Sequence, residues 1–216
     1  MRINQATDVL LAVDVQKTFM PGGGLAVAEG DGVVAPINAL LAGTFLHAVA
    51  TQDWHPRDHL SFAANHPGKQ PYDTIAMPYG EQTLWPVHAV TGTEEAALHP
   101  GLRQERFELV IRKGFHAAID SYSTFFENDR ATPTGLDGYL RARGFGRLFI
   151  AGIATDFCVA WSAEDGLRLG YEVFVIADAC RGIGIPTRAG RTTIDDARDR
   201  LAAGGARFIT SFDLQA

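Results

Sequence analysis

Short, uninterrupted apolar runs recur along this chain of 216 residues, and longer segments with a different periodicity separate them. A run of four or five apolar residues, such as residues 9–13, is typical of a strand that is covered on both faces. On this pattern, strands are expected at residues 9–13, 45–50, 109–111, 148–151, 173–177 and 206–209.

The segments between these runs carry apolar residues at helical spacing. Helices are expected at residues 31–42, 133–143, 155–169 and 186–203. Gly170 and Gly204 directly follow two of them, and glycine commonly ends a helix. Strands that alternate with helices predict an α/β fold: three layers, doubly wound, with a mostly parallel six-stranded sheet and helices on both faces.

One long stretch, around residues 53–106, departs from this alternation. It is rich in His, Pro, Gly and aromatic residues, and its periodicity is weak. An irregular segment of that length inside a compact domain is usually functional. No linker or repeat divides the chain, so residues 1–216 are expected to form a single domain with a metal- and substrate-binding insertion in this stretch.

Net charge and cysteine content limit the partners and the cellular compartment that are expected for this protein. The net charge is −6 at pH 7, which disfavours nucleic acid and anionic membranes as partners. No apolar run approaches the roughly 20 residues that span a bilayer, and the first residues lack the layout of a signal peptide. Two cysteines, Cys158 and Cys180, make no disulfide framework. A cytoplasmic protein is therefore expected, with a disulfide between these two disfavoured.

Polar residues gather where the expected strands end. Asp14 ends the first, Asp53 and His55 follow the second, Lys113 follows the third and Cys158 follows the fourth. Open α/β sheets bind ligands at the carboxyl ends of their strands. Each residue alone could be a cap or a turn residue, but four coincidences at one sheet edge favour a site.

Cys158 is the candidate nucleophile. Gly152 is expected to end the fourth strand and Thr155 to cap the next helix, which puts Cys158 in the first turn, where the helix dipole favours a thiolate. Lys113 would lower the thiol pKa further, and Asp14 could take the thiol proton and return it to a leaving amine. The competing interpretations are a buried, inert Cys158 and a solvated Lys113.

A metal site is expected beside this set. Asp53 and His55 stand two residues apart in an extended segment and so face the same way, and His88 could complete the set. Two imidazoles and a carboxylate suit one divalent metal ion: Zn, Fe or Mn. His59 and Ser61 are candidates for a further ligand or for hydrogen bonds to the ligands. The remaining histidines are interpreted as structural or surface groups: His47, His66, His99 and His116.

These motifs also occur in a recognisable order. They are residues 14–23, 53–56, 85–88, 113–114, 120–125 and 152–159. Together they resemble the nicotinamidase/pyrazinamidase family of the isochorismatase-like cysteine hydrolases, over nearly the whole chain. Lys17-Thr18 stands where that family commonly has Asn-Asp, and Met20 stands where it often has cysteine.

The resemblance implies a role for each motif. The implied catalytic triad is Asp14, Lys113 and Cys158, and the implied metal ligands are Asp53, His55 and His88. The implied substrate contacts are Phe19 and Trp85, which sandwich a pyridine ring, and Tyr122. The peptide between Ile153 and Ala154 is implied to be cis, so that the N–H groups of Ala154 and Cys158 form an oxyanion hole.

The implied reaction is hydrolysis of nicotinamide to nicotinate and ammonia through a thioester, with pyrazinamide as a further substrate. The partner is then a small pyridine carboxamide, and a homo-oligomer is implied as well. Three rival functions stay open: another isochorismatase-like amide or ureido hydrolase, a non-catalytic metal- or ligand-binding protein, and a redox-sensing thiol protein that would need Cys180 as its second thiol.

Overall fold

The computed structural model describes residues 1–216, except for the side chain of Ala189. Within these residues, six parallel strands form one sheet in the order β5-β2-β1-β6-β7-β8. The strands are β1 (Asp8–Val13), β2 (Ala48–Asp53), β5 (Leu109–Lys113), β6 (Arg147–Ile153), β7 (Glu172–Arg181) and β8 (Arg207–Ile209). The predicted α/β sheet is confirmed.

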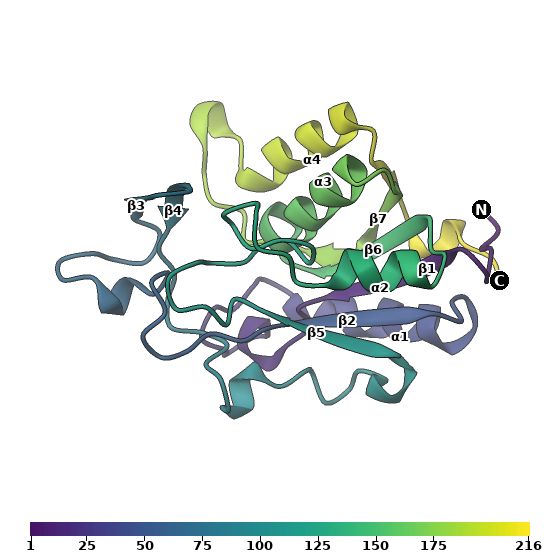
Figure 1. Ribbon diagram of the computed structural model, residues 1–216, viewed down its shortest axis with the longest axis horizontal. Coiled ribbons are helices and arrows are strands. Elements are labelled where there is room, and N and C mark those ends of the chain that lie inside the picture. The colour runs from purple at the N-terminus through teal and green to yellow at the C-terminus, as the bar shows by residue number, and fades with distance from the viewer.

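Helices cover both faces of this sheet. They are α1 (Val34–Gly43), α2 (Leu136–Ala142), α3 (Ala160–Arg168) and α4 (Thr193–Gly204). Figure 1 shows α3 and α4 side by side on one face, with α2 next to them, and α1 on the other face. Tyr171 Oη donates a hydrogen bond of 2.8 Å to Asp137 Oδ1, which joins α2 to the loop after α3. Because helices lie on both faces of the sheet, the predicted three-layer arrangement is confirmed.

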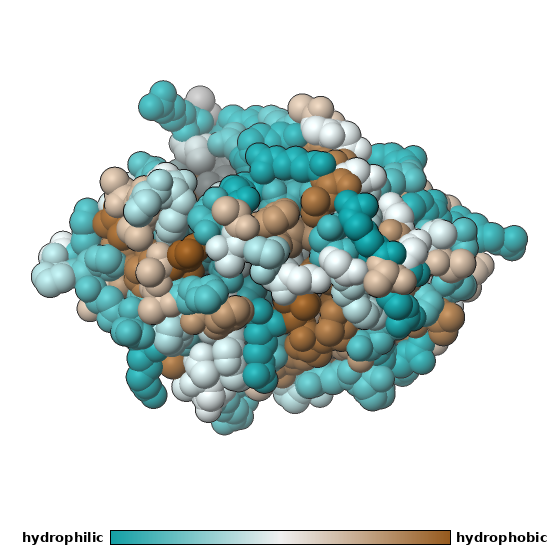
Figure 2. Space-filling model, viewed as in Figure 1, coloured by the Kyte–Doolittle hydropathy of each residue, from teal (hydrophilic) through white to brown (hydrophobic). Residues whose placement is uncertain are grey.

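The core lies along the central strands. Residues 9–13 of β1 are all 0% exposed, which explains why their sequence is apolar without alternation. β5 is one of the two edge strands, and there Leu109 and Ile111 are only partly buried. Figure 2 shows an apolar patch on the visible face over this strand. No helix in the described part of the chain is both long enough and apolar enough to cross a membrane.

Several predicted boundaries are wrong. The second strand runs from Ala48 to Asp53 and not over residues 45–50, because Phe45 packs its ring 5.0 Å from that of Phe149 in the core. The last helix begins at Thr193, since Pro186 pairs with Thr192 in a bridge before it.

Gly152 does not end the fourth strand. It continues β6, paired with Val13 on one side and Cys180 on the other. Its φ is +121°, and a Cβ atom there would lie 2.1 Å from the carbonyl oxygen of Val13. Glycine is therefore required for this close approach and not for a turn.

The irregular stretch contains a hairpin that the periodicity did not indicate. Its strands are β3 (Thr74–Met77) and β4 (Gly80–Thr83), and it projects from the body at the left of Figure 1. Most of its residues are at least partly exposed, but Gln82 is 1% exposed. The hairpin thus sends one polar side chain inward.

Candidate active site

Strand register brings the predicted catalytic residues together. Asp53 and Lys113 are direct partners across β2 and β5, and Val13 pairs with Gly152 across β1 and β6. Asp14 follows β1 with a positive φ of 49°, so its side chain leaves the strand direction at the sheet edge. The carboxyl ends of four neighbouring strands therefore converge on one point.

Cys158 lies in a π-helical turn, Thr155–Val159, which precedes α3. Ala154 is the N-cap, and no side chain caps the turn. The prediction that Thr155 is the cap is therefore wrong, since Thr155 is already the first residue of the turn. The prediction that Cys158 falls in the first turn of the helix is confirmed, and π turns occur frequently at functional sites.

Lys113 stands at the centre of the site. It is 0% exposed, so the interpretation as a solvated lysine is wrong. Its Nζ lies 2.9 Å from Asp14 Oδ2, pairs with Asp53 Oδ1, and donates a hydrogen bond of 2.8 Å to the carbonyl oxygen of Ser121. Burial lowers the pKa of Lys113, but the two carboxylates outweigh burial and raise it well above its usual value. The ammonium group therefore stays charged.

Cys158 Sγ lies 3.5 Å from this ammonium group. Even so, burial raises the pKa of the thiol well above its usual value, and the charge of Lys113 offsets only part of that effect. The carboxylates of Asp14 and Asp53 raise it further. The expectation of a lowered thiol pKa is therefore wrong, because burial and two neighbouring carboxylates oppose a further negative charge.

Asp14 is suited to take the thiol proton. Burial raises its pKa above the usual value, although Lys113 opposes this. Thr51 Oγ1 donates a hydrogen bond of 2.6 Å to Oδ1 and accepts one of 3.1 Å from the Asp14 N–H. Oδ2 pairs with the Lys113 ammonium group at 2.9 Å, and a carboxylate oxygen of Asp14 lies within 4.8 Å of Cys158 Sγ, so the carboxylate is placed to accept the thiol proton.

Asp53, His55 and His88 form a buried cluster whose ligand atoms lie within 4.8 Å of one another. Nδ1 of His55 donates to the carbonyl of Gly114 at 2.8 Å, and Nδ1 of His88 donates to that of Pro86 at 2.8 Å. Each Nε2 therefore presents a lone pair, at 3.7 and 3.8 Å from Asp53 Oδ2. Hydrogen bonds from Nδ1 to backbone carbonyls are typical of metal-ligating histidines, so these residues fit a divalent metal ion.

His59 lies behind this cluster. Its ring packs against that of His55, with centroids 4.2 Å apart and ring planes tilted by 36°. Nδ1 contacts Ser61 Oγ at 2.7 Å and Nε2 contacts the carbonyl of Ile119 at 3.2 Å, so both ring nitrogens are occupied. Burial lowers the pKa of His59 to about 4, which keeps the ring neutral. In this conformation His59 supports His55, although His59, His55 and Asp120 lie close enough to form an alternative ligand set.

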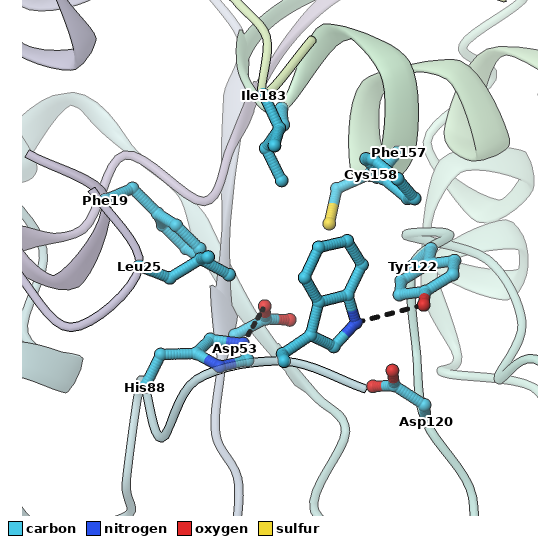
Figure 3. A pocket seen from close by; sticks show the side chains of 11 residues that line it. Phe19, Leu25, Asp53, His88, Asp120, Tyr122, Phe157, Cys158 and Ile183 are labelled. Atoms are coloured by element: carbon cyan, nitrogen blue, oxygen red, sulfur yellow. Dashed lines mark hydrogen bonds and ion pairs between the residues drawn. The ribbon is translucent and has the colours of Figure 1, made fainter. Parts of the chain in front are cut away.

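A pocket connects the metal cluster with the cysteine. It contains about 320 Å³ of free space, part of it open to solvent. Figure 3 shows Phe19 and Leu25 on one side and Tyr122 and Phe157 on the other, with the sulfur of Cys158 between them. The remaining walls come from Trp85, Asp120, Ala154 and Ile183.

The right-hand wall in Figure 3 is fixed by hydrogen bonds. Tyr122 Oη accepts one from Trp85 Nε1 and one from Gln82 Nε2, both at 3.0 Å. Gln82 also donates to Asp120 Oδ2 at 2.7 Å, so the hairpin braces this side of the pocket. The peptide bond between Ile153 and Ala154 is cis, as the resemblance implies.

The structure brings every predicted site residue to this pocket or directly behind it, but the sequence reasoning missed several contributors. They are Gln16, Leu25, Thr51, Asp156, Phe157 and Ile183. The alternation of side chains along β2 could have indicated Thr51, which faces the same way as Asp53. The position of Ile183 depends on contacts between distant segments, for which the sequence carries no local signal.

Comparisons with known proteins agree with this geometry. The family model described as Isochorismatase domain matches residues 8–205. The nicotinamidase of Acinetobacter baylyi is 51% identical over 98% of this chain and 96% of its own. The nicotinamidase of Escherichia coli is 45% identical over 94% and 95%.

Solved structures are similar as well. The nicotinamidase and pyrazinamidase from Acinetobacter baumanii has a TM-score of 0.91 at 49% identity, over 96% of this chain and 98% of its own. A protein of L. infantum in complex with nicotinate has a TM-score of 0.84 at 35% identity, over 98% and 96%. The pyrazinamidase of Pyrococcus horikoshii in complex with zinc has a TM-score of 0.72 at 29% identity, over 94% and 98%.

Proposed function

This chain belongs to the isochorismatase family, and on that premise we propose that it hydrolyses nicotinamide to nicotinate and ammonia. One observation carries the proposal. A single aromatic pocket has the buried set Asp14, Lys113 and Cys158 at one end and the candidate metal cluster at the other. Pyrazinamide offers the same amide and ring-nitrogen pattern and is a further substrate.

In the first half of the reaction, Cys158 Sγ attacks the amide carbon as its proton passes to Asp14 Oδ2. A C–S bond forms, and the N–H groups of Ala154 and Cys158 stabilise the oxyanion. The C–N bond then breaks as Asp14 returns the proton to the departing nitrogen, which leaves as ammonia. Because burial raises the pKa of the thiol, we propose that this proton transfer accompanies attack.

In the second half, water attacks the thioester carbon and gives one proton to Asp14. The C–S bond breaks, Asp14 returns that proton to Cys158 Sγ, and the product leaves as nicotinate after its acid proton passes to solvent. Lys113 keeps its charge throughout and stabilises the carboxylate and the developing thiolate. Phe19 and Trp85 hold the ring, and Tyr122 supports Trp85.

Asp53, His55 and His88 would hold one divalent metal ion. When bound, it would supply a coordination site for the ring nitrogen and so orient the amide toward Cys158, a positioning role. Zinc, iron and manganese all suit this donor set. Zinc in the structure of the Pyrococcus horikoshii relative supports a divalent ion here, and metal analysis of the purified protein would identify it.

The net charge of −6 supports the proposal that neither nucleic acid nor a membrane is a partner, and two free cysteines fit a cytoplasmic setting. A homo-oligomer is proposed on the resemblance alone. Size-exclusion chromatography with light scattering tests the assembly state.

Nicotinate and ammonia formation should be measured with the metal-replete protein, with and without a chelator. We expect turnover that the chelator abolishes and that metal restores. Cys158→Ala should abolish turnover while the bound metal content stays the same, which separates the hydrolase from a non-catalytic metal-binding protein. Failure of the folded, metal-replete protein to release nicotinate would refute the proposal.

A further inference from the structure

Asp156 lies two residues before Cys158, is 4% exposed, and points away from the catalytic set. Its Oδ1 accepts a hydrogen bond of 3.0 Å from the N–H of Ile183. Its Oδ2 accepts one of 2.9 Å from the N–H of Gly184 and one of 2.5 Å from Thr193 Oγ1. One carboxylate therefore fastens the loop after β7 to the turn that carries the nucleophile.

Close packing reinforces this attachment. A Cβ atom on Gly182 would lie 3.0 Å from Asp156 Oδ1 and 2.7 Å from two side-chain carbons of Ile194. A larger residue at position 182 would have to displace the end of the Ile194 side chain, so glycine favours the close approach of this loop to the turn and to α4. The loop thus has little freedom to move outward while the Asp156 contacts are intact.

The side chain held by this loop is Ile183, which lines the pocket together with Cys158 and Ala154. In Figure 3 it lies toward the Cys158 end, away from Asp53 and His88. The hydrogen bond from the Ile183 N–H to Asp156, two residues before Cys158, also places Ile183 at the Cys158 end of the pocket. Ile183 therefore borders the space where the amide of a substrate must sit.

The polar groups beneath the amide are held firmly. Asp14 and Lys113 beneath Cys158 are 0% exposed and tightly paired, whereas Ile183 is only partly buried. A group on the amide nitrogen that extends toward this end of the pocket would contact Ile183. Building on the proposed function, we infer that Ile183 is the specificity-determining wall that restricts the enzyme to primary amides, and that Asp156 is the positioning residue that holds it there.

Replacing Ile183 with alanine should admit N-methylnicotinamide. In that reaction Cys158 forms the thioester, the C–N bond breaks, methylamine leaves with the proton from Asp14, and water releases nicotinate. The experiment measures nicotinate formation by metal-replete, full-length protein, because an ammonia assay would miss methylamine. The ratio of kcat/KM for N-methylnicotinamide to that for nicotinamide should rise about 10- to 200-fold, the usual effect of one methyl group in a tight pocket.

Leu25→Ala is the matched control, since Leu25 is an apolar residue of the same pocket from a different segment. It should weaken binding of both substrates and leave the ratio near that of the wild type. An equal rise in the ratio for Leu25→Ala, or an unchanged ratio for Ile183→Ala with nicotinamide turnover retained, would overturn the inference. Absence of nicotinamide turnover in the wild type would instead refute the proposed function and, with it, this inference.

Asp156→Asn tests the positioning role separately. In the variant, an NH₂ group replaces one carboxylate oxygen and cannot accept a hydrogen bond from an N–H or O–H donor. The loop therefore loses part of its attachment to the turn. We expect KM to rise for nicotinamide with kcat little changed, and the substrate ratio to shift in the same direction as for Ile183→Ala. Thr193→Ser keeps the hydroxyl donor and should behave as wild type. A fall in kcat alone, with KM and the ratio unchanged, would contradict the positioning role.

Discussion

Lys113→Met removes the one positive charge that Asp14 and Asp53 share inside the protein. Methionine is similar in length, so the change removes the ammonium group with little loss of packing. All three side chains are at most 6% exposed, and solvent cannot replace the lost charge. Two carboxylates would then remain buried without a counter-ion.

The expected cost follows from the geometry. At an effective dielectric constant of about 20, unit charges 2.9 Å apart attract by about 6 kcal/mol. Breaking a buried ion pair by removing one partner costs about 3–5 kcal/mol in measured cases, because the remaining group takes up a proton or relaxes. We therefore expect the free energy of unfolding of the metal-free variant to fall by about 3–5 kcal/mol at pH 7.

The loss should depend on pH with a definite sign. Burial acts to raise the pKa of Asp53, but Lys113 outweighs it and holds that pKa well below the usual value. Without Lys113, the pKa values of both carboxyl groups would be raised in the folded state. The variant then gains stability as pH falls and these groups become protonated, so the difference from wild type should shrink between pH 8 and pH 5.

Urea unfolding of chelator-treated protein, followed by tryptophan fluorescence, measures this difference. Lys17→Met is the control, because Lys17 pairs with Glu94 at the exposed surface and should matter little. A loss below about 1 kcal/mol for Lys113→Met, or a difference that grows toward pH 5, would refute the reasoning. In the metal-replete enzyme, kcat/KM should fall at least about 100-fold.

Two further predictions concern buried polar groups near the site. Thr51→Val removes the hydroxyl that donates to Asp14 and should lower the free energy of unfolding, measured in urea, by about 1.5–3 kcal/mol. Thr51→Ser keeps the hydroxyl and should lower it far less. Equal losses for the two variants would contradict a hydrogen-bond effect. Glu127 is 1% exposed, and burial raises its pKa to about 7, so the folded protein should lose stability, on the order of 2–3 kcal/mol, as pH rises from about 4.5 to about 7. Glu127→Gln removes that titration and should therefore be more stable relative to wild type at pH 8 than at pH 5; equal differences at the two pH values would contradict it.

Much of the fold could be predicted from local pattern. The apolar runs identified every strand of the main sheet, because strands covered on both faces need apolar residues at successive positions. Their ends were less certain. The pattern predicts that Phe45 belongs to a strand, but Phe45 packs in the core after α1. It also predicts that Gly152 ends a strand, but Gly152 continues β6. The residue types fit both alternatives, and contacts with other segments decided between them.

The sequence by itself determined which residues could carry the chemistry: Asp14, Asp53, Lys113 and Cys158 stand at the ends of parallel strands, and such ends must meet at one sheet edge. Only the tertiary structure decided how they interact. The register pairs Asp53 with Lys113, burial raises the thiol pKa instead of lowering it, and Asp156 reaches a loop 27 residues ahead. These outcomes depend on distance and desolvation between segments remote in the chain, and local sequence pattern encodes neither.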